Sequence, residues 1–334
     1  MKQRSLGRTG LGVSEIGFGC GPTAGLMIRG TFDDRRNAVA RALDLGINYF
    51  DTAPVYGDTI SEANLGAILR SLDAKPIIAT KIALTLRDLD DIGGAVVRSV
   101  GASLARLGVD HLALVHLHNR VGPERAEKPD IGSGALLTVD DVLGPNGVVA
   151  ALKSLRDRGA IDFFGCCAFG GDTPAVERLI DSDAFDVVLV HYSLLNPTAW
   201  LSDTSPDLRD YGGVGASAAA AGMGSIALRV LEGGMLTSST ARHALAGPPL
   251  GVEEIALAER TTMLASLSNA MNLGEIAIRY ALSNEQLTTV LVGFSDTAQI
   301  EQTIGWADKG PLPISMLSHI HEQQTAHFTR KTGP

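Results

Sequence analysis

The stretch Asn48-Tyr49-Phe50-Asp51-Thr52-Ala53-Pro54-Val55-Tyr56-Gly57 decides the fold, because an apolar run ends there in a carboxylate and a tyrosine follows five residues later. Its first part predicts a short buried strand over residues 47–51, since aromatic and β-branched residues are typical of strands. Similar short apolar runs occur at residues 14–19, 76–81, 112–118, 161–167, 185–191, 225–230 and 288–293. The sequence therefore predicts eight strands.

Amphipathic stretches separate these strands and predict helices. The clearest lie at residues 35–45, 61–72, 90–107 and 148–158, and Gly46, Gly108 and Gly159 stand where three of them would stop. Strands that alternate with helices predict a parallel sheet, and eight such units predict closure into a (β/α)8 TIM barrel of the α/β class.

The eight units run through the chain without a low-complexity linker, so we expect a single barrel domain over residues 1–334. The glycine-rich residues before Ser14 predict a short N-terminal hairpin. Residues 119–147, rich in Gly and Pro, predict a long loop over the C-terminal mouth, where barrel active sites lie. Residues 311–334 are expected to form a C-terminal tail.

Composition limits the partners of the chain. Lys and Arg total 28 against 37 Asp and Glu, a net charge of −9, which repels nucleic-acid phosphates and anionic lipid. We therefore expect neither nucleic acid nor a membrane as partner, and the N-terminus has no apolar segment typical of a secretory signal. Cys20, Cys166 and Cys167 form no CxxC motif, which favours a cytoplasmic location. The oligomeric state stays open.

Polar side chains follow three consecutive strands of the predicted barrel. Asp51 and Tyr56 follow the second strand, Lys81 ends the third, and His118 ends the fourth. These side chains should converge, because the carboxyl ends of parallel strands meet at one end of a barrel. A phenol has a pKa of about 10 and needs a nearby cation to exchange protons at neutral pH. We expect Lys81, oriented by Asp51, to supply that charge, and His118 to donate a hydrogen bond to a substrate oxygen.

Two other interpretations of the sequence are a metal site and a Rossmann dinucleotide site. His116 and His118 face the same way along a strand, so they could hold zinc or iron in a metal-dependent hydrolase. Such a site needs further ligands from neighbouring strands, and Lys81 would crowd the cation, so we assign no metal ligand. The run Gly17-Phe18-Gly19-Cys20-Gly21-Pro22 fails the Rossmann dinucleotide pattern, because Pro22 stands where a helix would open.

Together these motifs resemble the aldo-keto reductase family in its bacterial branch, and more loosely its aldose and pyridoxal dehydrogenase members. The resemblance runs from Gly10-Leu11-Gly12-Val13-Ser14 through residues 50–57 to Leu291-Val292-Gly293. It implies a barrel that binds NAD or NADP across its mouth, with Tyr56 as general acid in reduction and general base in oxidation. The residues that would correspond to the family's catalytic tetrad are Asp51, Tyr56, Lys81 and His118.

The resemblance also implies which positions contact the cofactor. These are Gly19, Cys167, Ala168, Leu189, Leu228, Arg229, Leu231, Gly233, Gly293, Ser295, Asp296 and Gln299. Several depart from the family pattern: Cys167-Ala168 replaces a Ser-Asn pair that holds the nicotinamide carboxamide, Leu189 replaces a Gln, and Leu228 replaces a stacking aromatic. Backbone groups or His191 would have to hold the carboxamide instead.

The adenosine end favours NAD over NADP. Residues 293–302 contain no Lys or Arg to bind a 2′-phosphate, and Asp296 would repel it. A carboxylate can instead accept a hydrogen bond from the ribose 2′-OH, unless Asp296 is simply a surface residue. Arg229 is either a partner of the cofactor pyrophosphate or an ion-pair partner of Glu232.

The expected activity is the NAD(P)-dependent interconversion of an aldehyde, ketone or sugar hemiacetal with its alcohol or oxidised product. The substrate would be a small carbonyl compound or alcohol, with His191, Tyr192, Trp200 and residues 119–147 as candidates for its wall. Besides the metal-dependent hydrolase, the alternative is a non-catalytic subunit that senses the cofactor. Tight cofactor binding without turnover would favour that alternative.

Overall fold

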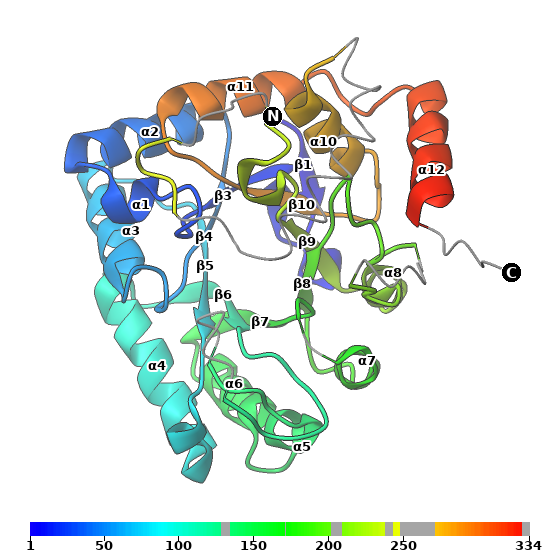
Figure 1. Cartoon of the computed structure of the whole chain (residues 1–334). Coiled ribbons are helices and arrows are strands. Elements are labelled where there is room, and N and C mark those ends of the chain that lie inside the picture. Colours follow the sequence, from blue (N-terminus) through cyan, green and yellow to red (C-terminus); the bar gives the residue numbers. More distant parts are fainter. Residues whose placement is uncertain (128–133, 171, 202–208, 238–242, 248–270, 329–334) are drawn as a thin grey trace, which may run out of the picture.

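Eight parallel strands close into a barrel in the computed structural model, in the order β10-β3-β4-β5-β6-β7-β8-β9, and helices surround them (Figure 1). The predicted (β/α)8 barrel is confirmed. The structure describes residues 1–127, 134–170, 172–201, 209–237, 243–247 and 271–328. The barrel strands are β3 (Ile16–Gly19), β4 (Tyr49–Asp51), β5 (Ile77–Ile82), β6 (Leu112–Leu117), β7 (Ile161–Cys167), β8 (Val187–His191), β9 (Gly224–Leu228) and β10 (Thr289–Gly293).

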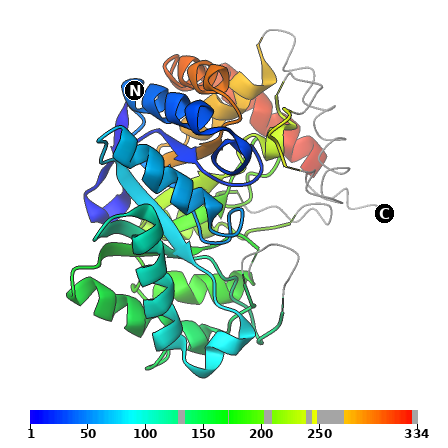
Figure 2. The same cartoon turned by 90° about the vertical axis from the view of Figure 1, so that its left-hand side faces the viewer.

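The helices pack outside the strands, and Figure 2 shows the blue to cyan helices α2, α3 and α4 lying over the barrel. Sequence-local signals set their ends: Thr31 caps α2 in a capping box with Asp34, and Gly108 ends α4 with a positive φ of 70°. The helices are α1 (Leu26–Arg29), α2 (Phe32–Asp44), α3 (Ile60–Ser71), α4 (Ile92–Leu107), α5 (Val139–Leu143), α6 (Val148–Asp157), α7 (Thr173–Asp181), α8 (Val214–Ala220), α10 (Leu273–Leu282), α11 (Thr297–Ala307) and α12 (Ile314–Phe328). Short 3-10 turns are η1 (Gly7–Thr9), η2 (Leu86–Asp90) and η4 (Glu232–Gly234).

A short hairpin precedes the barrel, as predicted. Its strands β1 (Gln3–Ser5) and β2 (Gly12–Ser14) pair antiparallel, so the run at 14–19 begins in the hairpin and only its second part is a barrel strand. Leu6 and Val13 belong to the apolar cluster of the barrel interior. The Arg4 guanidinium donates to the carbonyl oxygens of Leu282 (2.8 Å) and Leu287 (2.7 Å). The hairpin therefore closes the end of the barrel opposite the carboxyl ends of the strands.

The segments expected to form a long loop and a C-terminal tail contain helices. Helix α5 lies within the loop at 119–147, and α12 occupies most of the segment at 311–334 (Figure 1, red). Pro313 precedes the first turn of α12, where proline does not interrupt a helix. Helix α12 is anchored, because Ile320 is buried and the Gln324 side-chain amide donates to the Leu194 carbonyl oxygen at 2.9 Å. Residues 128–133 and 329–334, included in these two expectations, lie outside the described residues.

In the part of the chain that the structure describes, none of the helices combines the length and the apolar character needed to cross a bilayer.

Candidate active site

The four residues predicted to converge lie together at the carboxyl ends of β4, β5 and β6. Lys81 Nζ donates to Asp51 Oδ1 and, at 2.8 Å, to the Thr52 carbonyl oxygen. The same Nζ lies 4.8 Å from the centroid of the Tyr56 ring. The rings of Tyr56 and His118 are 5.9 Å apart and nearly perpendicular, at 86°. The arrangement therefore puts an ammonium beside a phenol and an imidazole beside both.

Burial divides these residues into two pairs. Asp51 and Lys81 are almost fully buried, at 2% and 1% exposed, whereas Tyr56 and His118 are only half-buried. The charged pair thus stands behind the two groups that can exchange or donate a proton. Tyr56 and His118 are therefore the groups placed to exchange or donate a proton to a ligand at the barrel mouth.

The protonation states follow from this arrangement. Burial raises the pKa of Tyr56 above its ordinary value, although the Lys81 charge acts in the predicted, opposite direction. Burial also disfavours the charged form of Lys81, but Asp51 and Tyr56 outweigh it and hold the pKa of Lys81 above its usual range. Burial and the charges of Lys81 and Arg120 lower the pKa of His118 to about 3. At neutral pH the site therefore holds a protonated phenol, an ammonium and a neutral imidazole.

A buried asparagine fixes the loop that follows His118, and the sequence interpretation missed it. The Asn119 Oδ1 accepts from the Leu84 amide, and its Nδ2 donates to the carbonyl oxygens of Leu84 and Ala135, each at 2.8 Å. Gly134 permits this close approach, because a Cβ there would lie 2.3 Å from the Leu84 carbonyl oxygen. The asparagine thus joins the loops after β5 and β6 and holds the strand end that carries His118.

His116 does not join the cluster as a metal ligand. It is buried in the barrel, and a Cβ at Gly165 would lie 2.4 Å from its Nδ1. Burial lowers the pKa of His116 well below its usual value. Among the described residues, no group of three or more His, Cys, Asp or Glu side chains could hold a metal ion.

The opposite wall of the barrel, at the ends of β7 and β8, is apolar. Cys167 and Leu189 pair in register, and both are buried with Ala168. Cys167 and Leu189 belong to the same apolar cluster as Tyr49 and Ile226, with Leu228 packed against it. These predicted cofactor positions therefore offer apolar packing surface, whereas the family that the sequence resembles has amide and hydroxyl groups there.

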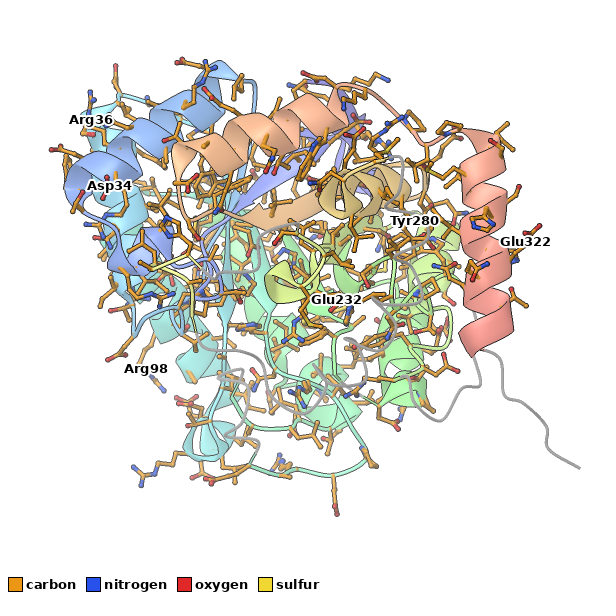
Figure 3. The ribbon with its side chains drawn as sticks, turned by 45° about the horizontal axis from the view of Figure 1, so that its top comes forward. Asp34, Arg36, Arg98, Glu232, Tyr280 and Glu322 are labelled. Carbon is orange, nitrogen blue, oxygen red and sulfur yellow. The ribbon has the colours of Figure 1, made fainter. Side chains whose placement is uncertain are left out.

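A buried polar network lies above this apolar wall. His191, at the end of β8, hydrogen-bonds through Nε2 to Glu232 Oε1 at 2.8 Å and through Nδ1 to the Tyr211 hydroxyl at 3.0 Å. Ser193 Oγ also donates to Glu232, and Figure 3 shows Glu232 near the centre of the molecule. Both ring nitrogens of His191 are thus engaged, so it is a poor substitute for the missing carboxamide anchors.

The loop after β9 has an unusual backbone. Arg229 and Glu232 have positive φ values of 58° and 45°, followed by Gly233 at 65° and Gly234 at 100°. A non-glycine residue in this region costs about 1 kcal/mol or more, and such residues cluster at functional sites. The Arg229 guanidinium lies 4.6 Å from the Phe169 ring centroid, and its charge helps to hold the pKa of Glu232 below its usual value against burial, after the larger contribution of His191.

The predicted adenosine-end residues are bound to one another after β10. Asp296 caps α11 by accepting from the Gln299 amide at 2.8 Å, and the Gln299 side chain accepts from the Ser295 amide at 2.9 Å. The Ser295 hydroxyl donates to the Ala24 carbonyl oxygen. Asp296 also lies 3.5 Å from His243. Asp296 is therefore a helix cap with a neighbouring imidazole, and its carboxylate is half-exposed.

Comparison with known proteins assigns the family. The model of the Aldo/keto reductase family matches residues 15–324. The chain belongs to the aldo/keto reductase family. It is an NAD(P)-dependent oxidoreductase, as the sequence predicts.

Relatives of this aldo-keto reductase include dehydrogenases. It is 30% identical over 311 residues to an L-galactose dehydrogenase of Arabidopsis thaliana, covering 90% of this chain and 86% of the relative. It is 25% identical to a pyridoxal 4-dehydrogenase of Microbacterium luteolum, covering 92% and 93% of the two chains. The holo form of an aldo-keto reductase from Bacillus halodurans has the same fold, with a TM-score of 0.74, 22% identity and 99% coverage of each chain.

The rim of this aldo-keto reductase fits its nicotinamide cofactor in part. Gly19 and Gly293 pair between β3 and β10, and a Cβ at Gly19 would lie 3.2 Å from the Val292 carbonyl oxygen. A Cβ at Gly293 would likewise lie 3.1 Å from the Ala24 Cβ, so the glycine pair lets these backbone segments approach one another closely. Arg229 and the glycines at 233 and 234 suit a phosphate group. The wall at Cys167 and Leu189 supplies no polar side chain beyond the thiol.

Proposed function

We propose that this aldo-keto reductase interconverts a small carbonyl compound and its alcohol, with Tyr56 moving the proton. The observation that carries the proposal is the half-buried phenol of Tyr56 beside the buried Lys81–Asp51 pair. In reduction, the Tyr56 hydroxyl gives its proton to the carbonyl oxygen. In oxidation, the Tyr56 phenolate accepts the proton of the alcohol.

Each remaining residue of the tetrad has a separate task in this proposal. Lys81 lowers the cost of the phenolate by its charge, and Asp51 holds the ammonium in place through its hydrogen bond. His118, neutral because its pKa is about 3, donates an N–H to the substrate oxygen as negative charge develops there. The nicotinamide, when bound, supplies or accepts the hydride.

The cofactor in this proposal is NAD rather than NADP. The half-exposed carboxylate of Asp296 at the start of α11 disfavours a 2′-phosphate, and His243 offsets this only when protonated. Oxidation of an alcohol or sugar hemiacetal is then the favoured direction, since the cellular NAD pool is mostly oxidised. The names of the dehydrogenase relatives above support oxidation as the direction.

The test uses two tyrosines, Tyr49 at the start of β4 and Tyr56 in the loop that follows this strand. We expect Tyr56→Phe to lower kcat about 100-fold or more, as loss of a general acid does, while the Kd for NADH stays within about threefold of wild type. Tyr49→Phe is the matched control. The Tyr49 hydroxyl has no hydrogen-bond partner among the described residues, so its removal should leave kcat near wild type. Unchanged turnover in Tyr56→Phe would refute the proposal.

The same measurements distinguish a cofactor-sensing subunit from an enzyme. A sensor would bind NADH tightly but show no turnover on a panel of aldehydes, ketones and sugars in the wild type. The proposal predicts wild-type turnover of at least one panel member.

A further inference from the structure

The chain forms a left-handed turn directly after Tyr56. Gly57, Asp58 and Thr59 have φ values of 63°, 49° and 72°. Glycine adopts such angles freely, whereas a β-branched residue such as threonine is strained there. Backbone strain of this kind persists only where the surrounding structure holds it, and it is typical of functional sites. The contacts around this turn therefore bear on where Tyr56 lies.

The inner side of the turn is held by Ser61, the second residue of α3. Ser61 is fully buried, and its amide donates to the carbonyl oxygen of Tyr56 at 3.2 Å. Its hydroxyl donates to the Cys20 carbonyl oxygen and lies 2.9 Å from the Thr52 hydroxyl. Because the Ser61 hydroxyl has one hydrogen, which it gives to Cys20, Thr52 is the donor to Ser61.

Thr52 continues this chain of hydrogen bonds to the buried ammonium. Its carbonyl oxygen accepts from Lys81 Nζ at 2.8 Å. Its amide donates to the Ala79 carbonyl oxygen at 2.9 Å, which fixes the residue to β5. A continuous path thus runs from Lys81 through Thr52 and Ser61 to the backbone of Tyr56, and this path sets the phenol relative to the ammonium.

The outer side of the turn is held by packing and by helix contacts. Helices α1 and α3 lie side by side (Figure 1), and the Asn64 side-chain amide donates to the Met27 carbonyl oxygen at 2.7 Å. A Cβ at Gly57 would lie 2.7 Å from a side-chain carbon of Ile28. Removal of the Ser61 hydroxyl would leave these outer contacts intact and free the turn on its inner side.

We infer that Ser61 is a positioning residue for the proton transfer: its hydroxyl fixes the turn at residues 57–59 and keeps the Tyr56 phenol next to the Lys81 ammonium. The inference rests on the proposed function, in which Tyr56 moves the substrate proton. A displaced phenol would lose its alignment with the substrate oxygen. It would also lose part of the stabilisation that the ammonium gives to its phenolate.

The main test is Ser61→Ala, measured as single-turnover reduction by NADH of an aldehyde or ketone that wild type turns over. The rate constant of hydride transfer should fall about 10- to 100-fold, the cost of a small misplacement of a reacting group. The fraction of enzyme that reacts and the Kd for NADH should stay near wild type. A loss of folded protein would instead lower the fraction that reacts and leave the rate constant unchanged.

A pair of substitutions at Thr52 tests the same path from its other end. Thr52→Val keeps the shape of the side chain but removes the donor to Ser61, so the rate constant should fall about 3- to 10-fold, as for loss of one neutral hydrogen bond. Thr52→Ser keeps a hydroxyl and should stay near wild type.

Ser71→Ala is the matched control for Ser61→Ala. Ser71 is the last residue of the same helix, and its hydroxyl also donates to a backbone carbonyl oxygen, that of Ile68 at 2.7 Å. It is exposed and lies at the opposite end of α3 from Tyr56, so its removal should leave the rate constant unchanged.

Two further measurements show whether Ser61 acts through the phenol. The charge of Lys81 lowers the pKa of Tyr56 against the larger effect of burial. In Ser61→Ala the alkaline decline of carbonyl reduction should therefore move to higher pH, by about half a pH unit or more. In a Tyr56→Phe background, Ser61→Ala should cause no additional loss, because the group that it positions is gone.

The outcomes separate the inference from the proposed function. If Tyr56→Phe abolishes turnover, a wild-type rate constant in Ser61→Ala overturns the inference alone. A loss that is equally large in the Tyr56→Phe background overturns it as well. If Ser61→Ala does not fold, equal rate constants for Thr52→Val and Thr52→Ser overturn it. Full activity of Tyr56→Phe, or no turnover by wild type, counts against the proposed function and the inference together.

Discussion

The two walls of the barrel mouth differ in how they are built. The wall of β4, β5 and β6 carries a polar group at each strand end, and Lys81, Asp51, Tyr56 and His118 contact one another directly. The wall of β7, β8 and β9 is packed with apolar side chains, and its polar network is displaced into the loops. The first wall keeps the pattern implied by the family resemblance, whereas the second departs from it. The groups suited to proton transfer thus lie on one side of the mouth, whereas the other side is mainly packing surface.

The largest effect is expected from a substitution in the first wall, that of β4, β5 and β6. Lys81→Met should lower kcat by about 10²- to 10⁴-fold, because the phenolate loses its neighbouring cation. Lys309→Met removes a lysine that also pairs with a carboxylate, Glu275 Oε2 at 2.7 Å, but lies on the outside of the barrel. Its kcat should match wild type. A folded Lys81→Met protein with kcat within tenfold of wild type would contradict the role given to the ammonium.

A second substitution tests whether the other wall serves as apolar core and not as a surface that binds the nicotinamide carboxamide. Leu189→Gln restores the family's residue type but places an amide in a fully buried site. We expect the free energy of unfolding to fall by about 2–4 kcal/mol, from lost apolar burial and an unsatisfied amide. The exposed Leu201→Gln should change it by less than about 0.5 kcal/mol. Tighter NADH binding without loss of stability in Leu189→Gln would show that the wall is a binding surface.

The polar network should make a smaller, pH-dependent contribution. Burial raises the pKa of Glu232, but His191 and Ser193 outweigh it and hold the pKa below the ordinary value of 4.5. A carboxylate whose pKa is lowered in the folded state stabilises the fold above its unfolded pKa and loses this contribution as the pH falls through the folded pKa. Glu232→Gln should therefore cost about 1–3 kcal/mol at neutral pH, and the gap from wild type should narrow below pH 4.5. Urea unfolding of both proteins at neutral pH and below pH 4.5 measures this difference in the free energy of unfolding. A difference that grows on acidification would contradict the stabilising role given to the Glu232 carboxylate.

The smallest expected effect concerns cofactor choice. Asp296→Asn keeps a side-chain oxygen for the cap of α11 but removes the charge near the adenosine end. The ratio of kcat/KM for NADPH to that for NADH should rise about two- to fivefold, as for a half-exposed charge, with little change in melting temperature. A wild-type preference for NADPH would refute the choice of NAD.

The first wall could be predicted from the sequence, because each of its residues follows a recognisable strand and parallel strands bring their ends together. The polar network of His191 and Glu232 on the second wall could not be predicted from the sequence. His191 and Glu232 are 41 residues apart, and no local pattern couples them. Asn119 gave no signal either, since its role depends on how the loops after β5 and β6 meet. Helix α12 was missed because Pro311 and Pro313 suggested irregular chain up to and beyond the point where the helix begins.

The central claim, that one phenol both gives and takes the substrate proton, is tested most directly by the pH dependence of single-turnover hydride transfer in both directions. Because burial raises the pKa of Tyr56, alcohol oxidation should accelerate with rising pH throughout the neutral range, while carbonyl reduction should stay constant there and fall only in the alkaline range. Both dependences should vanish in the residual activity of Tyr56→Phe. Oxidation that is independent of pH in the wild type, or a pH dependence that survives in Tyr56→Phe, would contradict the account.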